Sequence, residues 1–338
     1  MTRLRIVASQ CGQGRTKYSY NRLLFDRLAR KHQLWINPKD GFDLTVDDLK
    51  SEIAEADILI AGWGSGLVPG EVYAHAKKLK QICLIGSSIK PISPTQAWER
   101  GVTITNTSPA IGQSVAEFVL GLMLRWLHPY DMYDRILKAG TPWQTARESR
   151  IQRDLSDITV GLVGCGVTVR YLAPALLALG TRTLVYDPFV DRSKVEPGLE
   201  FVDDLISLMT ESDIVSLHAG MTPETRHMIG HTELAAMRDG ALLINAARGG
   251  LIDHDALAEQ LIAKRIHAAL DVFDPEPLTV DDRLRSLPNI TLTPHVAGTF
   301  SITLYERCCR IIESNVDAMA EGKPLTQVVT PEMFARMT

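Results

Sequence analysis

Three residues of this chain bring a cation, a carboxylate and an imidazole into similar local settings. They are Arg248, Glu276 and His295, and each one closes or follows a short apolar run that indicates a buried parallel strand. Open α/β sheets bind their ligands just beyond the carboxyl ends of such strands. We therefore expect the three side chains at one edge of a sheet, where they would hold an anionic substrate and move a proton. These are the groups that reduction of a 2-keto acid requires.

Short apolar runs alternate with amphipathic stretches in two series, and each series predicts a parallel sheet with helices on both faces. Strands are expected at 4–8, 58–61, 82–85 and 102–105, and then at 158–163, 183–186, 214–217, 241–244 and 268–270. Helices are expected at 20–31, 72–79, 94–100, 114–124, 171–179 and 302–321, and a loop at 141–157. The pattern predicts two doubly wound α/β domains, and the late helix is expected to return to the first of them.

A glycine-rich turn after the strand at 158–163 predicts a dinucleotide site. Gly164 and Gly166 would permit a tight turn and close approach of a pyrophosphate to the following helix, near Cys165, Val167 and Thr168. Asp187 lies 187 − 164 = 23 residues after the first glycine, close to the roughly 20 expected for a ribose-binding acid. An acid there repels a 2′-phosphate, so NAD is expected rather than NADP. Val169 stands where the third glycine is expected, which should push the helix outward.

Composition limits the alternatives. The 338 residues are 45% hydrophobic and 22% charged, as in a soluble globular protein. The net charge of −4 does not indicate the excess of basic residues that binding to nucleic acid requires. We expect no signal peptide, no membrane partner and a cytoplasmic location, since the sequence shows no cleavable leader and no apolar run judged long enough to span a bilayer. The five cysteines form no Cys-x-x-Cys pair, so neither a disulfide framework nor a metal site is expected.

Together these motifs resemble the D-isomer-specific 2-hydroxyacid dehydrogenase family, mainly between about residues 114 and 298. The matching runs are SVAE at 114–117, VGLVGCG at 160–166, YDP at 186–188, LH at 217–218, TPET at 222–225, NAARG at 245–249, Asp253, AALDVFDPEP at 268–277 and TPH at 293–295. The resemblance implies a flavodoxin-like substrate domain from 1–105 plus 298–338 and a Rossmann NAD-binding domain from 106–297, with a cleft between them.

The resemblance also implies residue roles. Arg248 would hold the substrate carboxylate and carbonyl, and His295 would exchange a proton with the keto oxygen. Glu276 would pair with His295 and orient its ring, and Asp271 would receive the nicotinamide carboxamide. The positions implied as cofactor contacts are Gly164, Cys165, Gly166, Val167, Thr168, Asp187, His218, Thr222, Ala246, Arg248, Asp271 and His295. His218 is interpreted as a residue that anchors its loop in preference to a catalytic one.

Two loops are expected to touch the substrate. One is Gly86-Ser87-Ser88-Ile89-Lys90, whose Ser87 and Lys90 depart from the usual family pattern, and the other is Gly64-Ser65-Gly66-Leu67. Ser65, Gly66, Ser87 and Ser88 are the predicted substrate contacts in addition to Arg248 and His295. Gly220 replaces a proline of the family pattern, so its loop should be less rigid. These departures leave the identity of the keto acid open.

Other functions compete with an NAD-dependent 2-keto acid reductase. The same family contains NAD(H)-sensing corepressors that keep the catalytic residues, although no basic patch or disordered tail favours that function here. Formate dehydrogenases carry glutamine at the position of Glu276, and the longer phosphoglycerate dehydrogenases would have a further domain after the last helix. The apolar helix near 114–124, with Trp126 and Trp143 after it, predicts a homodimer. His227, His231, His254 and His267 are expected at the surface.

Overall fold

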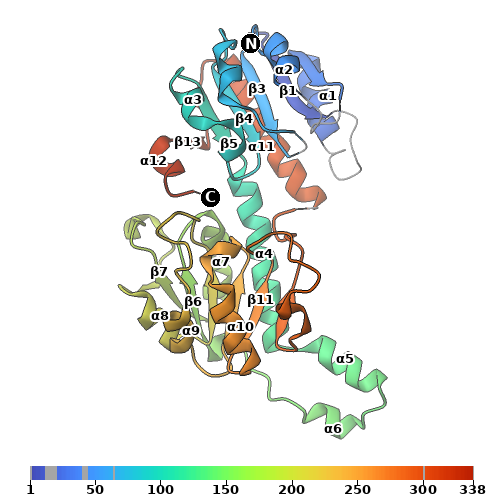
Figure 1. The fold of residues 1–338 in the computed structure, drawn as a ribbon, viewed down its shortest axis with the longest axis vertical. Helices are drawn as coiled ribbons and strands as arrows, with labels where there is room; N and C mark the ends of the chain where they lie inside the picture. Colours follow the sequence, from blue (N-terminus) through green and yellow to red (C-terminus); the bar gives the residue numbers. More distant parts are fainter. Residues whose placement is uncertain (1, 12–20, 40–44, 64, 300, 338) are drawn as a thin grey trace. The chain divides into compact units, whose positions relative to one another are not determined.

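The computed structural model describes residues 2–11, 21–39, 45–63, 65–299 and 301–337. The chain divides into two compact units, the first formed by Met1–Ile111 with Thr299–Thr338 and the second by Gly112–Gly298. The sequence-based boundaries, after 105 and before 298, lie within a few residues of this division. Each unit is built on its own parallel sheet with helices on both faces (Figure 1), so the predicted fold class, two doubly wound α/β domains, is confirmed.

The sheet of the first unit has six strands in the order β13-β5-β4-β3-β1-β2. The strands are β1 (Arg5–Cys11), β2 (Gln33–Asn37), β3 (Ile58–Gly62), β4 (Gln81–Ile85), β5 (Thr103–Asn106) and β13 (Val328–Val329). All neighbours pair in parallel except β13, which runs antiparallel to β5. The central strands β3 and β4 are apolar and almost wholly buried, as parallel strands covered on both faces must be.

Helices from both ends of the chain cover this sheet. They are α1 (Asn21–Lys31), α2 (Val46–Ile53), the 3₁₀ turns η3 (Gly70–Ala74) and η4 (Lys90–Ile92), α3 (Pro94–Trp98), α11 (Ile302–Ala320) and α12 (Pro331–Phe334). The late helix α11 packs against α1 and β4, and Arg27 of α1 donates to Glu313 of α11 at 2.6 Å. The expectation that this helix completes the first domain is therefore confirmed.

The second unit contains a seven-stranded sheet in the order β12-β11-β10-β9-β6-β7-β8, and every pairing is parallel. Its strands are β6 (Thr159–Val163), β7 (Arg182–Tyr186), β8 (Glu200–Phe201), β9 (Ile214–Leu217), β10 (Leu242–Asn245), β11 (His267–Leu270) and β12 (Ile290–Leu292). The helices and turns around it are α7 (Val167–Ala178), η6 (Arg192–Lys194), α8 (Leu205–Glu211), α9 (His231–Ala236), η7 (Gly249–Leu251), α10 (His254–Ile262) and η8 (Arg283–Ser286).

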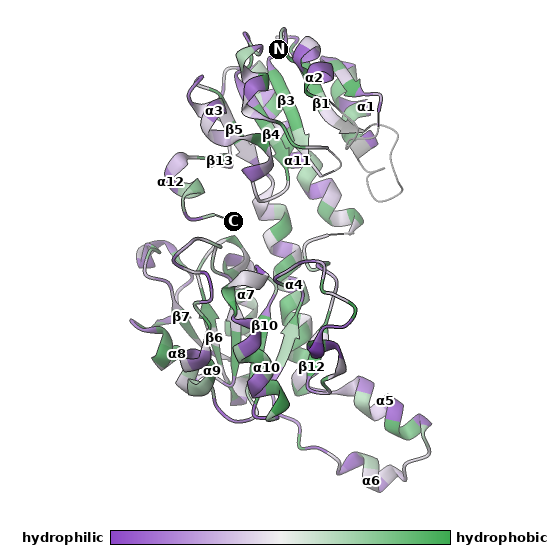
Figure 2. Ribbon diagram, viewed as in Figure 1, coloured by the Kyte–Doolittle hydropathy of each residue, from purple (hydrophilic) through white to green (hydrophobic). Residues whose placement is uncertain are grey.

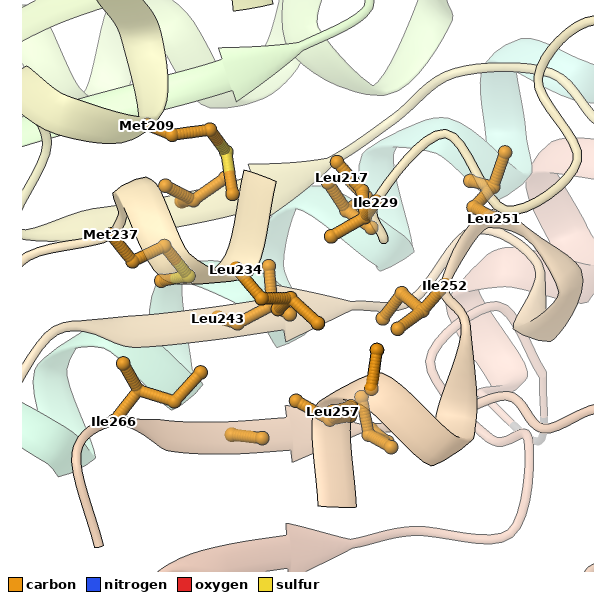
Figure 3. Packing of buried hydrophobic residues seen from close by; sticks show 14 of the residues in the cluster. Met209, Leu217, Ile229, Leu234, Met237, Leu243, Leu251, Ile252, Leu257 and Ile266 are labelled. Carbon is orange, nitrogen blue, oxygen red and sulfur yellow. The ribbon is translucent and has the colours of Figure 1, made fainter. Parts of the chain in front are cut away.

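Buried side chains between this sheet and the helices α8 to α10 form the core of the second unit. Figure 3 shows how Leu217, Leu234, Leu243 and Leu257 meet from neighbouring elements. In Figure 2 the strands of both sheets are among the greenest segments. A packed apolar core of this kind fixes the strand ends, and therefore the loops beyond them, in defined positions.

A long apolar helix and two shorter ones precede β6. They are α4 (Ser108–Leu127), α5 (Tyr130–Lys138) and α6 (Trp143–Arg147), followed by the turn η5 (Leu155–Asp157). By length and composition α4 could cross a membrane, contrary to the expectation that no segment is long enough. In the structure, 44% of its most apolar 18-residue stretch is buried inside the protein, as expected for a helix that packs on a core.

Two further sequence-based expectations were wrong in detail. The helix expected at 72–79 is only the 3₁₀ turn η3, and the loop expected at 141–157 contains α6 and η5. Helix α5 was not expected, although its apolar residues recur at helical spacing, and no residue of it is buried.

Candidate active site

His295 and Glu276 form a hydrogen-bonded pair at the carboxyl edge of the second unit's sheet. His295 follows β12 and Glu276 lies in the loop after β11, and the distance from His295 Nδ1 to Glu276 Oε1 is 2.6 Å. Both side chains are partly open to solvent, with exposed fractions of 43% and 39%. Because Nδ1 is engaged by the carboxylate, Nε2 is the ring atom left to exchange a proton with a ligand.

Asp271 organises the loop that carries the histidine. It follows β11, is 1% exposed, and accepts hydrogen bonds from the Thr293 hydroxyl at 2.6 Å and from the amides of Val296 and Ala297 at 2.9 Å. The Asp271 carbonyl in turn accepts from the His295 amide at 2.8 Å. His295 itself has a φ of +54°, a left-handed conformation that costs free energy in a non-glycine residue, and these bonds hold it there.

Arg248 is positioned by a short turn after β10. The Asn245 side chain, fully buried, donates to the Arg248 carbonyl at 2.8 Å and accepts from the Ala247 amide at 3.0 Å. The next residue, Gly249, lies so close to the following loop that a Cβ would stand 2.0 Å from the carbonyl carbon of Phe273. Only glycine permits this approach, which brings the turn bearing Arg248 against the loop bearing Glu276.

The charges of Arg248 and Glu276 influence one another. Burial lowers the pKa of the Arg248 guanidinium from its usual value, and the nearby Glu276 carboxylate partly restores it. The guanidinium stays charged because even a lowered arginine pKa lies far above neutral pH. Arg248, Glu276 and His295 are thus brought together, as the sequence predicted, in an arrangement that can bind a carboxylate and transfer a proton beside it.

A cavity of about 330 Å³ adjoins the histidine–glutamate pair. Apart from the pair itself and Arg285, its walls are mainly apolar: they come from Phe273, Pro277, Leu278, Leu292 and Pro294. Apolar walls reduce the local dielectric screening, so a charged ligand group in this cavity would interact more strongly with the side chains around it than in open water.

The turn after β6 has the geometry of a dinucleotide-binding loop. Gly164 has a φ of +93°, and a Cβ there would stand 2.7 Å from the Ala219 amide nitrogen, so only glycine lets the turn lie against the end of β9. Asp187 lies beside this turn, because its carboxylate accepts from the Cys165 amide at 2.7 Å and from the Phe189 amide at 2.8 Å. The Val190 amide also donates to Asp187, at 3.1 Å and to the same oxygen as Phe189, so a lone pair on the other oxygen remains for a ribose hydroxyl.

Helix α7 starts directly after this loop, with Gly166 as its N-cap and Val167 and Thr168 in its first turn. Its amino-terminal amides face a position where a pyrophosphate is stabilised by the helix dipole. Val169 is 1% exposed, so the valine in place of the third glycine is accommodated in the interior. The turn at Gly164–Gly166, the amino terminus of α7 and the Asp187 carboxylate after β7 together fit NAD.

The loop after β9 lies next to the turn at Gly164. The His218 amide donates to Val163 at 2.7 Å, and burial lowers the pKa of the His218 side chain to about 4, so the ring is neutral at physiological pH. The hydroxyl of Thr225 donates to the Gly220 carbonyl at 2.7 Å and accepts from the Thr222 amide at 2.8 Å. These bonds cross-link the loop in which Gly220 replaces a proline.

The predicted substrate loops belong to the first unit. Gly64 lies outside the described residues. The Ser65 hydroxyl donates to the Gly62 carbonyl at 2.7 Å and accepts from the Gly62 amide at 2.9 Å, so it stabilises its own turn. Ser87 and Ser88 are half-buried at the end of β4, where the Ser87 carbonyl accepts from Asn106 at 2.9 Å.

Several residues have environments that sequence reasoning missed. Asn245 and Thr293 support the catalytic loops, and the only available signal was that each is a polar residue at or just beyond a strand end. His254 and His267, expected at the surface, are half-buried, and burial lowers the pKa of each imidazole. Within the described ranges, no group of three or more His, Cys, Asp or Glu side chains could hold a metal ion.

The sequence of this chain is similar to a known protein family and to several characterised relatives. Residues 120–297 match the model of the D-isomer specific 2-hydroxyacid dehydrogenase, NAD binding domain. The chain is 36% identical over 259 residues to a hydroxypyruvate reductase of Thermotoga maritima, covering 76% of this chain and 82% of that protein. It is 37% identical over 288 residues to a D-3-phosphoglycerate dehydrogenase of Methanocaldococcus jannaschii, covering 85% of this chain and 54% of that protein. The chain thus spans about half the length of the phosphoglycerate dehydrogenase.

Solved structures show the same fold. A glyoxylate reductase from Paecilomyes thermophila superposes with a TM-score of 0.80 at 25% identity, covering 98% of this chain and 99% of that one. The apo form of a Rhodotorula graminis D-mandelate dehydrogenase gives a TM-score of 0.82 at 24% identity, covering 97% of this chain and 98% of that one. At that level of identity the second comparison bears on the fold alone.

Proposed function

Because the chain belongs to the D-isomer specific 2-hydroxyacid dehydrogenase family, we propose that it interconverts a 2-keto acid and a D-2-hydroxy acid with NAD(H), with His295 as the acid and base. The observation that carries this proposal is the 2.6 Å contact between His295 Nδ1 and Glu276. This contact orients the imidazole and leaves Nε2 available for a proton transfer.

In the reductive direction, protonated His295 donates its Nε2 proton to the keto oxygen as the carbonyl carbon is reduced. Bound NADH supplies the hydride. The electron pair of the carbonyl π bond moves to the oxygen and forms the new O–H bond, and the imidazole becomes neutral. In the oxidative direction, neutral His295 takes the hydroxyl proton back. Glu276 stabilises the imidazolium that exists before reduction and after oxidation.

Arg248 acts on the substrate in both directions. Its planar guanidinium can form two parallel hydrogen bonds to a carboxylate, which fixes the angle at which the keto group is presented. Its charge also polarises the carbonyl that receives the hydride. We assign the binding of the substrate carboxylate to Arg248.

Asp187 supports a preference for NAD(H) over NADP(H). Its carboxylate would repel a 2′-phosphate, and the nearest downstream arginine is already engaged: Arg192 pairs with Asp203 at 2.9 Å and lies 4.9 Å from the centroid of the Phe201 ring. We also propose that the protein is a homodimer that associates through α4, α5 and α6.

The test is NADH oxidation by the purified protein with a panel of keto acids that includes glyoxylate, hydroxypyruvate, pyruvate and bulkier compounds. We expect turnover with at least one of them, and His295→Ala should lower kcat by about 10²–10⁴-fold while NADH affinity is retained. Near-normal turnover of His295→Ala would show that the proton comes from another group.

A further inference from the structure

An ion pair joins two loops at the carboxyl edge of the second unit's sheet. Arg226 belongs to the loop after β9 and Asp274 to the loop after β11, and Arg226 Nη2 donates to Asp274 Oδ2 at 2.8 Å. Both residues lie in the second unit. Asp274 stands two residues before Glu276, so the pair attaches the loop after β11 to its neighbour at a point close to the Glu276 carboxylate.

The turn after β10 lies against the same ion pair. A Cβ on Gly250 would stand 3.2 Å from Arg226 Nη1 and 3.2 Å from Asp274 Oδ2, and Gly250 is buried. The Gly250 carbonyl also accepts from the His227 amide at 2.8 Å. Because Gly250 comes only two residues after Arg248, the pair holds the loop after β11 against the turn that carries this arginine.

Burial does not fix the position of Glu276, because residues 275–277 are exposed. The loop is held by hydrogen bonds on the two sides of the carboxylate instead. On the far side, Arg285 donates to the carbonyls of Leu278 at 2.9 Å and Thr279 at 2.7 Å. On the near side, the ion pair at the preceding aspartate performs this task.

The place of the Glu276 carboxylate sets the direction of the His295 ring. The two side chains are joined through Nδ1 at 2.6 Å, so a displacement of the carboxylate turns the ring and moves Nε2, the atom that exchanges the proton. Proton and hydride transfer depend steeply on such alignment, and a displacement of about 1 Å can lower a rate by about 100-fold.

We propose that the ion pair between Arg226 and Asp274 positions Glu276, and through it His295, for proton transfer. This inference rests on the proposed function, since it concerns the same reaction. Arg226 and Asp274 are positioning residues, which act through Glu276. Their side chains are 52% and 35% exposed, and an ion pair this open to solvent contributes little to stability. Its removal should therefore affect catalysis more than folding.

The experiment measures kcat for the best keto acid of the panel, the KM for NADH and the Tm. We expect Arg226→Gln and Asp274→Asn each to lower kcat by roughly 10- to 100-fold, with the KM for NADH and the Tm nearly unchanged. The double variant should lose no more than either single one, because the two residues act through one contact. Arg226→Lys keeps the charge without the planar fork and should recover part of kcat.

Arg283→Gln is the matched control. Arg283 pairs with Asp255 of α10, and both arginines line the same cavity of about 420 Å³. The control therefore removes an arginine–aspartate pair from the same part of the second unit without releasing Asp274, and kcat should stay at the wild-type value.

Three results would overturn the inference while the proposed function stood: an unchanged kcat in Arg226→Gln, an equal loss in Arg283→Gln, or a loss of kcat matched by a large fall in Tm. If the wild-type protein reduced no keto acid, the proposed function itself would fail, and the role of the ion pair would fail with it.

Discussion

The contact between His295 and Glu276 combines orientation of the ring with stabilisation of its charge, and Glu276→Gln separates the two. The amide oxygen of glutamine can still accept the Nδ1 hydrogen bond, so the ring keeps its direction, but the negative charge is lost. Because reduction needs the protonated imidazole and its charge is no longer stabilised, kcat for keto acid reduction should fall while the affinity for NADH is retained. Measurements of kcat and of the KM for NADH test this, and an unchanged kcat would contradict the electrostatic role of Glu276.

Asp187 is the residue on which the cofactor preference depends. Replacing it with alanine removes the charge that repels a 2′-phosphate and the acceptor for the ribose hydroxyls. We expect kcat/KM for NADH to fall by about 10- to 100-fold, the worth of one or two charge-assisted hydrogen bonds, while NADPH is affected much less. Asp191→Ala is the control, since Asp191 is a nearby acid that caps η6 and pairs with Lys194 at 2.8 Å. A wild-type protein that prefers NADPH would show that the argument from Asp187 is wrong.

At the scale of elements, the sequence revealed the strands that are apolar along their length. It did not identify helices α2, α8, α9 and α10, although each carries buried residues. The strands β3, β4, β6 and β9 were predicted because each is apolar along its length, as a strand covered on both faces must be. The edge strands β2, β8 and β13 were missed. They are short or half-exposed, so burial imposes no clear pattern on their residues.

The meeting of Arg248, Glu276 and His295 could be predicted because parallel strands of one sheet deliver the residues at their carboxyl ends to a common edge. What the sequence could not show was the support behind these residues. The Asp271 carboxylate, which the resemblance assigns to the nicotinamide, accepts hydrogen bonds from Thr293, Val296 and Ala297. Such hydrogen bonds join loops far apart in the chain, and no local spacing encodes them.

The helices α4 to α6 offer the apolar surface on which the predicted homodimer depends. Tyr130, Leu137 and Trp143 are 58%, 40% and 72% exposed, and Ile151 just beyond α6 is 90% exposed. Surface of this kind, contributed by consecutive elements, is typical of a subunit interface. We expect light scattering at micromolar concentration to give twice the mass of one chain.

The double variant Trp143→Glu, Ile151→Glu should shift this mass towards that of the monomer, because two charges would have to be buried in the interface. Val280→Glu is the matched control: Val280 is also 90% exposed but belongs to the loop after β11 and not to the segment of α4 to α6. A wild-type mass equal to one chain would rule the dimer out.

In the whole molecule, several buried histidines make the free energy of unfolding depend on pH in the same direction. Burial lowers the pKa of His32, His218, His254 and His267, in the case of His218 from 6.5 to about 4. In the unfolded chain these groups take up protons near pH 6.5, but in the folded protein they remain neutral to lower pH. The unfolded state therefore binds more protons as the pH falls below about 6.5, and the free energy of unfolding must decrease in that range.

We expect the Tm measured by calorimetry to fall between pH 7.5 and pH 5, before most carboxylates titrate. His218→Gln, which removes the titrating group, should flatten this decline even if it lowers the Tm itself, because a neutral amide binds no proton in either state. His231→Gln, the same substitution at an exposed position of the same unit, is the control for the change of residue type. A Tm that stayed constant to pH 5 in the unmodified protein would mean that these imidazoles accept protons without unfolding.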